Sequence, residues 1–355
     1  MPLINQCSHT SRGQIADCIY KYIQNRVAVR RHRRRNMKLG FVSDSLGGMS
    51  RKEMLDHAQR MGVSGIEVNT CGWSTAPHCN MSDLLGNKTA QEAFQAEFED
   101  RGLEIISLNA NGNPLHPTDP AQGQALRDTI RLAGEMGIKT VCTMSGLPAG
   151  SANDVMPNWV VSSWPPETQD ILRYQWEEKL IPFWTDIVAL AQENGVEKIA
   201  LELHGNQCVY NVPSLLKLRA AVGNTVGANL DPSHLFWMGA DPLVAAEALG
   251  EAVYHVHAKD TFLNAPVQAT TSLLENGSLM DIPARSWSYI TLGFGHGEEW
   301  WRQFCYRLKM GGYDGWLSIE HEDVLLNSLE GLEKSVTLLQ GVMPDRPADF
   351  KPQDI

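Results

Sequence analysis

The sequence predicts an α/β protein with a single (β/α)₈ barrel, in which eight parallel strands alternate with eight helices. Eight short apolar runs alternate with amphipathic helical stretches along most of the chain, which favours a (β/α)₈ barrel over an open sheet. Several helical stretches end at a glycine that lies one to three residues before the next apolar run, as helix C-caps do. The 355 residues suffice for one barrel of this kind.

Strands are expected wherever a short apolar run lies between helical stretches. In chain order they are Lys38–Val42, Gly65–Asn69, Leu103–Asn109, Lys139–Met144, Lys198–Leu203, Val226–Leu230, Val253–Ala258 and Trp316–Glu320. The first helix should begin after Ser50, because Ser50 and Glu53 have the spacing of a capping box.

Two connections on the carboxyl side of the strands are enlarged, namely residues 145–167 after strand four and 259–297 after strand seven. Long connections in compact domains are usually functional. They carry Trp159, Trp164, Trp287 and Tyr289, whose rings suit the apolar faces of sugars or pack the loops on the barrel rim.

The two ends of the chain differ from the predicted barrel domain, residues 37–341. Residues 1–36 hold eight Lys or Arg and one acid, a net charge of +7, so the remainder carries −18 of the total −11. We expect this segment to be a disordered basic extension or a start-site artefact; a transit peptide or a nucleic-acid-binding arm stays open. Residues 342–355 are expected to form a C-terminal tail.

Composition and charge argue against two classes of binding partner and favour one cellular location. No run approaches the roughly 18 apolar residues needed to cross a bilayer, so no membrane partner is expected. The acidic barrel would repel phosphate backbones, which argues against nucleic acid. The seven cysteines are scattered without a C-x-x-C pair, which favours a reducing, cytoplasmic location.

Four polar side chains each end a predicted strand: Glu202, Asp231, His257 and Glu320. In a barrel of parallel strands these carboxyl ends meet at one mouth, where active sites lie. Carboxylates with one imidazole predict a divalent metal site, with Mn²⁺ as the first choice and Mg²⁺, Co²⁺ or Zn²⁺ as alternatives. Such an ion can polarise a carbonyl and stabilise the enolate formed beside it.

Two further histidines share a strand face with these residues, because side chains alternate with period two. His204 lies two residues past Glu202 and is expected to contact substrate. His255 lies two residues before His257, deeper in the barrel, and is interpreted as a core histidine with a hydrogen-bond partner.

The motifs NLDPSH, H-x-H-x-K-D and S-I-E-H-E, with the glutamate that ends strand five, together resemble the xylose isomerase-like TIM barrels. That family includes sugar phosphate isomerases and epimerases, and inosose dehydratases, and the resemblance runs from Met37 to about Gly341. It implies that Glu202 and Glu320 bind the metal and exchange protons with a carbon next to a carbonyl, through a metal-stabilised enediolate.

The resemblance also implies substrate-binding roles for four residues: His234, Lys259, Glu67 and Asn109. For His234 the alternative is a helix-capping contact, and for Lys259 a surface lysine paired with Asp260. Glu67 and Asn109 are expected either to contact substrate or to support the site indirectly.

The sequence therefore predicts a metal-dependent isomerase or epimerase of a sugar, a sugar phosphate or a keto-sugar. The enlarged loops leave open a lyase that eliminates a β-substituent from a 3-keto-glycoside or inosose, and a non-catalytic sugar-binding barrel is a third alternative. The related DNA endonucleases need histidines where this chain has Asn69 and Asn109, so a nuclease is not expected. Relatives are often dimers or tetramers, which leaves a homo-oligomer open.

Overall fold

The structure is a computed structural model that describes residues 36–344 and 346. The predicted basic extension, except Asn36, and most of the predicted C-terminal tail lie outside these residues. No helix in the described part of the chain is long and apolar enough to span a membrane.

Within residues 36–344, eight parallel strands close into a barrel in the order β1-β10-β7-β6-β5-β4-β3-β2. Closure comes from the first and last barrel strands, in which Lys38 pairs with Trp316. The strands are β1 (Lys38–Val42), β2 (Gly65–Asn69), β3 (Glu104–Ala110), β4 (Thr140–Thr143), β5 (Lys198–Glu202), β6 (Val226–Leu230), β7 (Val253–Ala258) and β10 (Trp316–Ile319). The predicted (β/α)₈ fold is confirmed.

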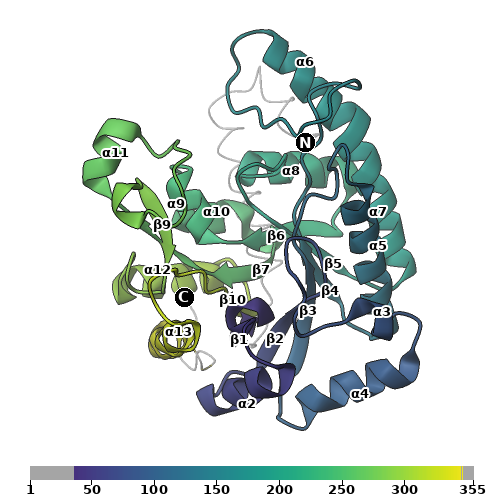
Figure 1. Ribbon diagram of the computed structural model, residues 1–355, viewed down its shortest axis with the longest axis vertical. Helices are drawn as coiled ribbons and strands as arrows, with labels where there is room; N and C mark the ends of the chain where they lie inside the picture. The colour runs from purple at the N-terminus through teal and green to yellow at the C-terminus, as the bar shows by residue number, and fades with distance from the viewer. Residues whose placement is uncertain (1–35, 345, 347–355) are drawn as a thin grey trace, which may run out of the picture. The chain divides into compact units, whose positions relative to one another are not determined.

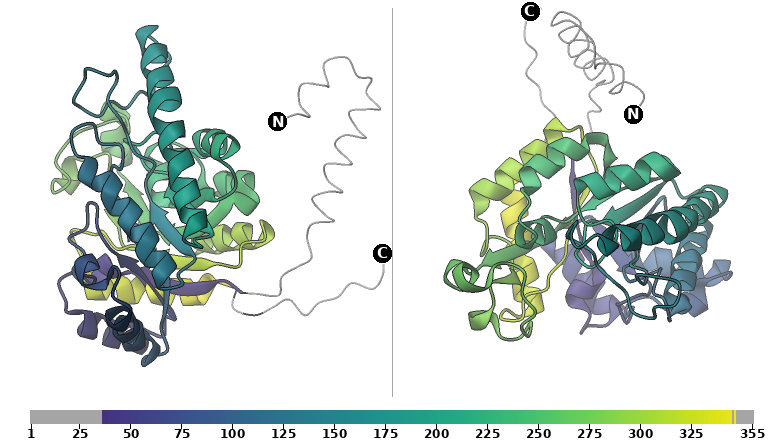
Figure 2. Two further views of the ribbon diagram at one scale, coloured as in Figure 1. Left: turned by 90° about the vertical axis from the view of Figure 1, so that its right-hand side faces the viewer. Right: turned by 90° about the horizontal axis from the view of Figure 1, so that it is seen from above.

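Helices surround the strands (Figures 1 and 2). They are α2 (Arg51–Met61), α3 (Met81–Leu84), α4 (Lys88–Glu99), α5 (Pro120–Glu135), α6 (Glu167–Arg173), α7 (Ile181–Glu193), α8 (Val212–Val222), α9 (Pro232–Trp237), α10 (Pro242–Leu249), α11 (Ala265–Thr271), α12 (Glu298–Met310) and α13 (Ser328–Val342). A π-helical turn, η3 (Tyr174–Leu180), joins α6 to α7. The capping box of α2 is confirmed, since the Glu53 N–H donates to Ser50 Oγ and the Ser50 N–H donates to the Glu53 carboxylate.

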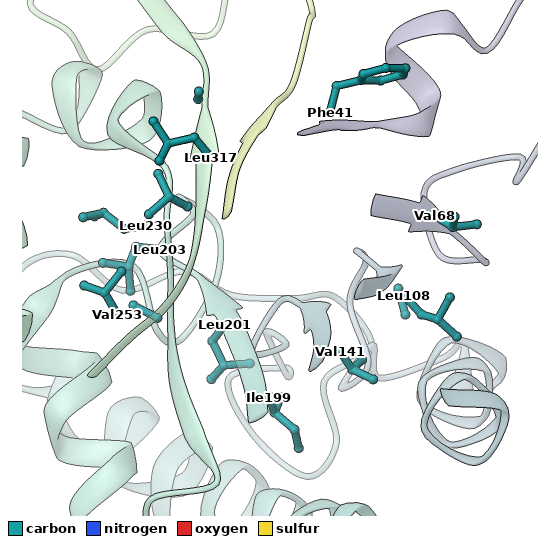
Figure 3. Packing of buried hydrophobic residues seen from close by; sticks show 14 of the residues in the cluster. Phe41, Val68, Leu108, Val141, Ile199, Leu201, Leu203, Leu230, Val253 and Leu317 are labelled. Carbon is teal, nitrogen blue, oxygen red and sulfur yellow. The ribbon is translucent and has the colours of Figure 1, made fainter. Parts of the chain in front are cut away.

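Alternation along the strands separates a hydrophobic face from a polar one. Ile199 and Leu201 of β5 are fully buried in the hydrophobic core, which also includes Val141 of β4 and Leu108 of β3 (Figure 3). Glu202 therefore belongs to the opposite, interior face of β5. This alternation brings polar side chains from separate strands together inside the barrel.

The segment 259–297 is not a simple loop. It contains a two-stranded antiparallel sheet made of β8 (Asp260–Leu263) and β9 (Trp287–Ile290), with α11 between them. Both strands have only four residues, too short to show a clear alternation in the sequence. Tyr289 of β9 pairs with Thr261 of β8. Because β8 begins two residues after the barrel strand β7 ends, this pairing holds Tyr289 close to the end of β7.

Gly65 tests how tightly the barrel strands pack. A Cβ at this position would collide with the Ile106 side chain and lie 2.6 Å from Trp316 Cζ3. We expect Gly65→Ala to lower the free energy of unfolding by about 1–3 kcal/mol, measured by urea denaturation, because overpacking forces neighbours apart. Gly48→Ala is the matched control, since nothing lies within 4 Å of its added Cβ. Equal stability of the two variants would contradict this packing.

Candidate active site

The ends of β5, β6, β7 and β10 bring the four predicted side chains together. Glu202, Asp231, His257 and Glu320 each present a donor atom, and these atoms all lie within 4.8 Å of one another. The first three are almost fully buried, and the Glu320 side chain is 14% exposed. We call these four residues the cage.

Two atoms of the cage are suited to a metal because no described residue forms a hydrogen bond with them. Asp231 Oδ2 and His257 Nδ1 are buried and form no hydrogen bond. Asp231 Oδ2 lies 3.3 Å from Lys259 Nζ, and His257 Nδ1 lies 3.3 Å from Glu320 Oε2. Both pairs are within ion-pair distance but lack hydrogen-bond geometry. The other oxygen, Oδ1, accepts from the Ser233 N–H and caps α9. Unpartnered carboxylate and imidazole donors at one point fit a hard or borderline divalent ion.

Glu67 holds His257 from behind. The Nε2 atom of His257 lies 3.1 Å from Glu67 Oε1, His255 Nε2 lies 2.6 Å from Oε2, and Asn109 donates to Oε1 at 2.6 Å. Glu67 and Asn109 have no exposed surface, so these contacts favour indirect support of the cage for both residues. A carboxylate behind a histidine fixes the orientation of its ring toward a metal. His255 is the buried, hydrogen-bonded histidine that was expected.

The charges around His257 favour its protonated form when no metal is bound. Burial acts to lower the pKa of His257, but the carboxylates of Glu67 and Glu320 outweigh it and raise the pKa well above its usual value. A metal that binds Nδ1 would therefore release a proton.

Lys259 is a buried member of the site. Its ammonium group lies 2.5 Å from Glu320 Oε2 and 3.2 Å from Glu322 Oε2, and 4.7 Å from the centre of the Tyr289 ring. The alternative of a surface lysine paired with Asp260 is wrong, because Lys259 is only 3% exposed.

Asp260 does not pair with Lys259; it binds the turn before α12. Its carboxylate accepts from the N–H groups of Gly293 and His296 and contacts the His296 ring. It thereby holds the GFGHG turn before α12.

The two glutamates of the cage differ in their surroundings. Burial, followed by the negative charge of Glu320, raises the pKa of Glu202 to about 8. Burial would also raise the pKa of Glu320, but Lys259 and His257 outweigh it and lower that pKa. A bound divalent cation would favour the charged form of both.

His234 and His204 lie beside Glu202. His234 Nε2 is hydrogen-bonded to Glu202 Oε1 at 2.7 Å, and His234 Nδ1 is hydrogen-bonded to the Tyr289 hydroxyl at 2.9 Å. The His204 ring lies 4.0 Å from that of His234, centre to centre, and its Nδ1 contacts the Gly205 carbonyl. Burial lowers the pKa of His204 to about 4, so its ring is neutral near pH 7. The capping contact considered for His234 is made by Asp231 instead.

Three contacts of the site did not follow from the sequence reasoning. The Asn111 side chain donates to Glu202 Oε2 at 2.6 Å, Tyr289 reaches His234, and Glu322 pairs with Lys259. Asn111 and Glu322 lie two residues beyond Asn109 and Glu320, just past the ends of β3 and β10, so their closeness to the strand ends could have indicated them. No sequence pattern indicates the contact of Tyr289 with His234, because it depends on the pairing of β8 with β9.

Of the aromatic side chains in the two long connections, some pack against other rings and one is exposed to solvent. Trp287 is buried and stacks on Trp237 of α9, with ring centres 4.8 Å apart and planes within 7°. Trp164 is 74% exposed. Trp159 packs edge-on against Tyr210 at 5.4 Å.

Comparison with known proteins agrees with this geometry. Residues 55–341 match the model of the family described as xylose isomerase-like TIM barrel. The chain belongs to this family. It is also 44% identical over 310 residues to the uncharacterized protein YfiH of Bacillus subtilis (strain 168), covering 86% of this chain and 98% of YfiH.

Solved structures share the fold at low identity. The IolI protein with a bound zinc atom is 16% identical, with a TM-score of 0.60 over 86% of this chain and 98% of IolI. The probable 3-DHS dehydratase AsbF of Bacillus anthracis is 19% identical, with a TM-score of 0.59 over 86% and 99%. An L-ribulose 3-epimerase is 14% identical, with a TM-score of 0.57 over 86% and 93%. Sugar epimerases and a dehydratase are thus structural neighbours of this xylose isomerase-like barrel.

The contact between Glu67 and His257 can be tested by metal binding. We expect Glu67→Gln to weaken binding of Mn²⁺ by about 10- to 100-fold in calorimetry, because the amide no longer holds the histidine ring as a carboxylate does. Glu104→Gln is the control, since Glu104 of β3 is exposed and pairs with Lys38. Unchanged affinity in Glu67→Gln would show that Glu67 does not support the cage.

Proposed function

We propose that this protein is a metal-dependent isomerase or epimerase of a sugar, a sugar phosphate or another keto-sugar. One observation carries the proposal: two glutamates share a buried cage with an aspartate and a histidine, all within 4.8 Å. Such a site combines metal ligands with two carboxylates that can exchange protons. The family membership supports a carbohydrate substrate.

The metal would be held by Glu202, Asp231, His257 and Glu320. We propose Mn²⁺ first, with Mg²⁺ or Co²⁺ as alternatives; the zinc in the related IolI structure supports Zn²⁺ as a further one. When bound, the ion would polarise the substrate carbonyl and stabilise the negative charge that forms when the neighbouring carbon loses its proton.

The proton chemistry falls to the two glutamates. One of Glu202 and Glu320 would take the proton from the carbon beside the carbonyl, and the other would deliver a proton to the product. Hydrogen bonds from Asn111 and His234 orient Glu202, whereas the ammonium group of Lys259 holds Glu320. The different partners of the two carboxylates suit them to different steps.

Substrate oxygens would bind to the neighbouring polar groups. His204 is the best placed of the histidines, because its Nε2 has no partner among the described residues while its Nδ1 faces Gly205. Both ring nitrogens of His234 are already engaged, which favours orienting Glu202 as its main role. Lys259 could hold an anionic oxygen of the substrate.

A lyase is the second candidate, supported by the likeness to the dehydratase AsbF. Removal of the same proton can be followed by loss of a substituent on the next carbon, which would release water from an inosose or an aglycone from a 3-keto-glycoside. The residues would be the same, and only the fate of the carbanion would differ.

Exchange with solvent deuterium tests the proposal. Metal-loaded protein is incubated in D₂O with ketoses, inososes and 3-keto-glycosides and followed by NMR. Epimerisation or isomerisation should place deuterium on the carbinol carbon, whereas elimination should release an aglycone or an enone.

We expect Glu202→Gln and Glu320→Gln each to slow turnover by about 10²- to 10⁴-fold, the usual contribution of a general acid or base.

Glu197→Gln is the matched control, because Glu197 immediately precedes β5 at the other end of the barrel and its side chain is 68% exposed. It should keep the parent rate. If Glu202→Gln and Glu320→Gln also kept it, the proton-transfer roles would be wrong. Sugar binding without turnover in any assay would instead identify a non-catalytic sugar-binding barrel.

A further inference from the structure

A cleft of about 350 Å³ is lined in part by the connection between β4 and α6. Its walls come from residues 159–163 of that connection, from α6 and η3, and from residues 207–214 before and within α8. The helix α6 lies at the top of Figure 1, and α8 lies below it. The volume is at the small end of the range for ligand pockets, which suits one ring of a ligand.

Two nearly buried glutamine side chains, Gln175 and Gln207, line the cleft, and each has one amide atom without a hydrogen-bond partner among the described residues. Gln207 is 1% exposed and its Oε1 accepts from the Gly146 N–H at 2.7 Å, which leaves Nε2 without a partner among the described residues. Gln175 is also 1% exposed; its Nε2 contacts three backbone carbonyls, and Oε1 has no partner in residues 36–344. Neither of these two atoms is fully shielded from solvent, so each is open to a hydrogen bond from a ligand in the cleft.

Aromatic rings form much of the remaining wall. Trp159, Trp176 and Tyr210 line the cleft. Among its described lining residues Lys217 is the only charged one, and its ammonium group lies 3.9 Å from the centre of the Trp176 ring. Aromatic surfaces with neutral amide donors and acceptors match a sugar ring, which has apolar C–H faces and hydroxyl groups at its edge. A phosphate would need more cationic groups.

The chain segment after β5 borders both the active site and the cleft, because His204 lies beside Glu202 and Gln207, three residues further on, lines the cleft. Gly205 directly follows His204, and an added Cβ there would lie 2.5 Å from Trp237 Cζ2 and 3.4 Å from Trp159 Cη2. Only glycine lets these two indoles approach the chain at this point. Trp159 therefore borders the cleft on one side and the His204 segment on the other.

We propose that this cleft binds a second, neutral sugar ring of the substrate. On this basis the substrate is a two-ring glycoside: the reacting keto-sugar lies at the cage and the attached ring lies between Trp159 and the amides of Gln175 and Gln207. This inference rests on the proposed function for the reacting ring, but binding in the cleft can be measured without turnover.

The test uses the metal-loaded protein with maltose, cellobiose and trehalose as neutral two-ring probes, and glucose 6-phosphate as a charged one. Affinities are measured by calorimetry and contacts by saturation-transfer NMR. We expect at least one disaccharide to bind, and Gln207→Glu to weaken it by about 3- to 10-fold, because the new carboxylate keeps the acceptor for Gly146 but loses the donor. Trp159→Phe should weaken the same disaccharide, since the ring surface is smaller.

Gln340→Glu on the exposed side of α13 is the control for the change in charge, and it should bind like the parent. The proposal is overturned if no disaccharide binds, if both cleft variants match the parent, if Gln340→Glu is weakened as much as Gln207→Glu, or if glucose 6-phosphate binds best.

The two proposals fail separately. Deuterium exchange on free ketoses, with no effect of the cleft variants on disaccharide binding, would overturn the second-ring site alone. Disaccharide binding that depends on Gln207, with no exchange or elimination on any keto-sugar, would overturn the proposed reaction and leave the cleft as a sugar site.

Discussion

Burial of several carboxyl groups at one point is the constraint on which the rest of the site depends. Glu202, Asp231 and Glu320 converge with little exposure to water, and isolated buried carboxylates are costly. In the protein alone, Lys259 and the imidazole of His257 supply the opposing charge. A divalent cation would supply it more fully, and Asp231 Oδ2 and His257 Nδ1 are left without hydrogen bonds at the point where it would bind.

The surrounding residues keep this cluster in place. Glu67 fixes His255 and His257 from across the barrel, and Asn111 and His234 fix Glu202. The β8–β9 hairpin adds Tyr289, which reaches His234 from outside the barrel. Each contact joins residues from different strands or loops, so closure of the barrel is what brings the site together.

Much of the barrel could be predicted from the sequence because strand alternation and helix capping are local. All eight barrel strands lie where apolar runs predicted them, and the strand-end positions of Glu202, Asp231, His257 and Glu320 placed them at one mouth. The partner of Lys259 could not be predicted, because Asp260 is adjacent in sequence while Glu320 lies 61 residues away and becomes a neighbour only when the barrel closes. Tyr289 depends in the same way on the pairing of two four-residue strands, which no local pattern indicates.

Diffraction from crystals grown with Mn²⁺, recorded at the manganese absorption edge, tests the central claim most directly. The account predicts one anomalous peak within bonding distance of Glu202, Asp231, His257 and Glu320. A peak held instead by Glu202, His204 and His234, or by Glu67, His255 and His257, would contradict it. So would the absence of any peak inside the barrel.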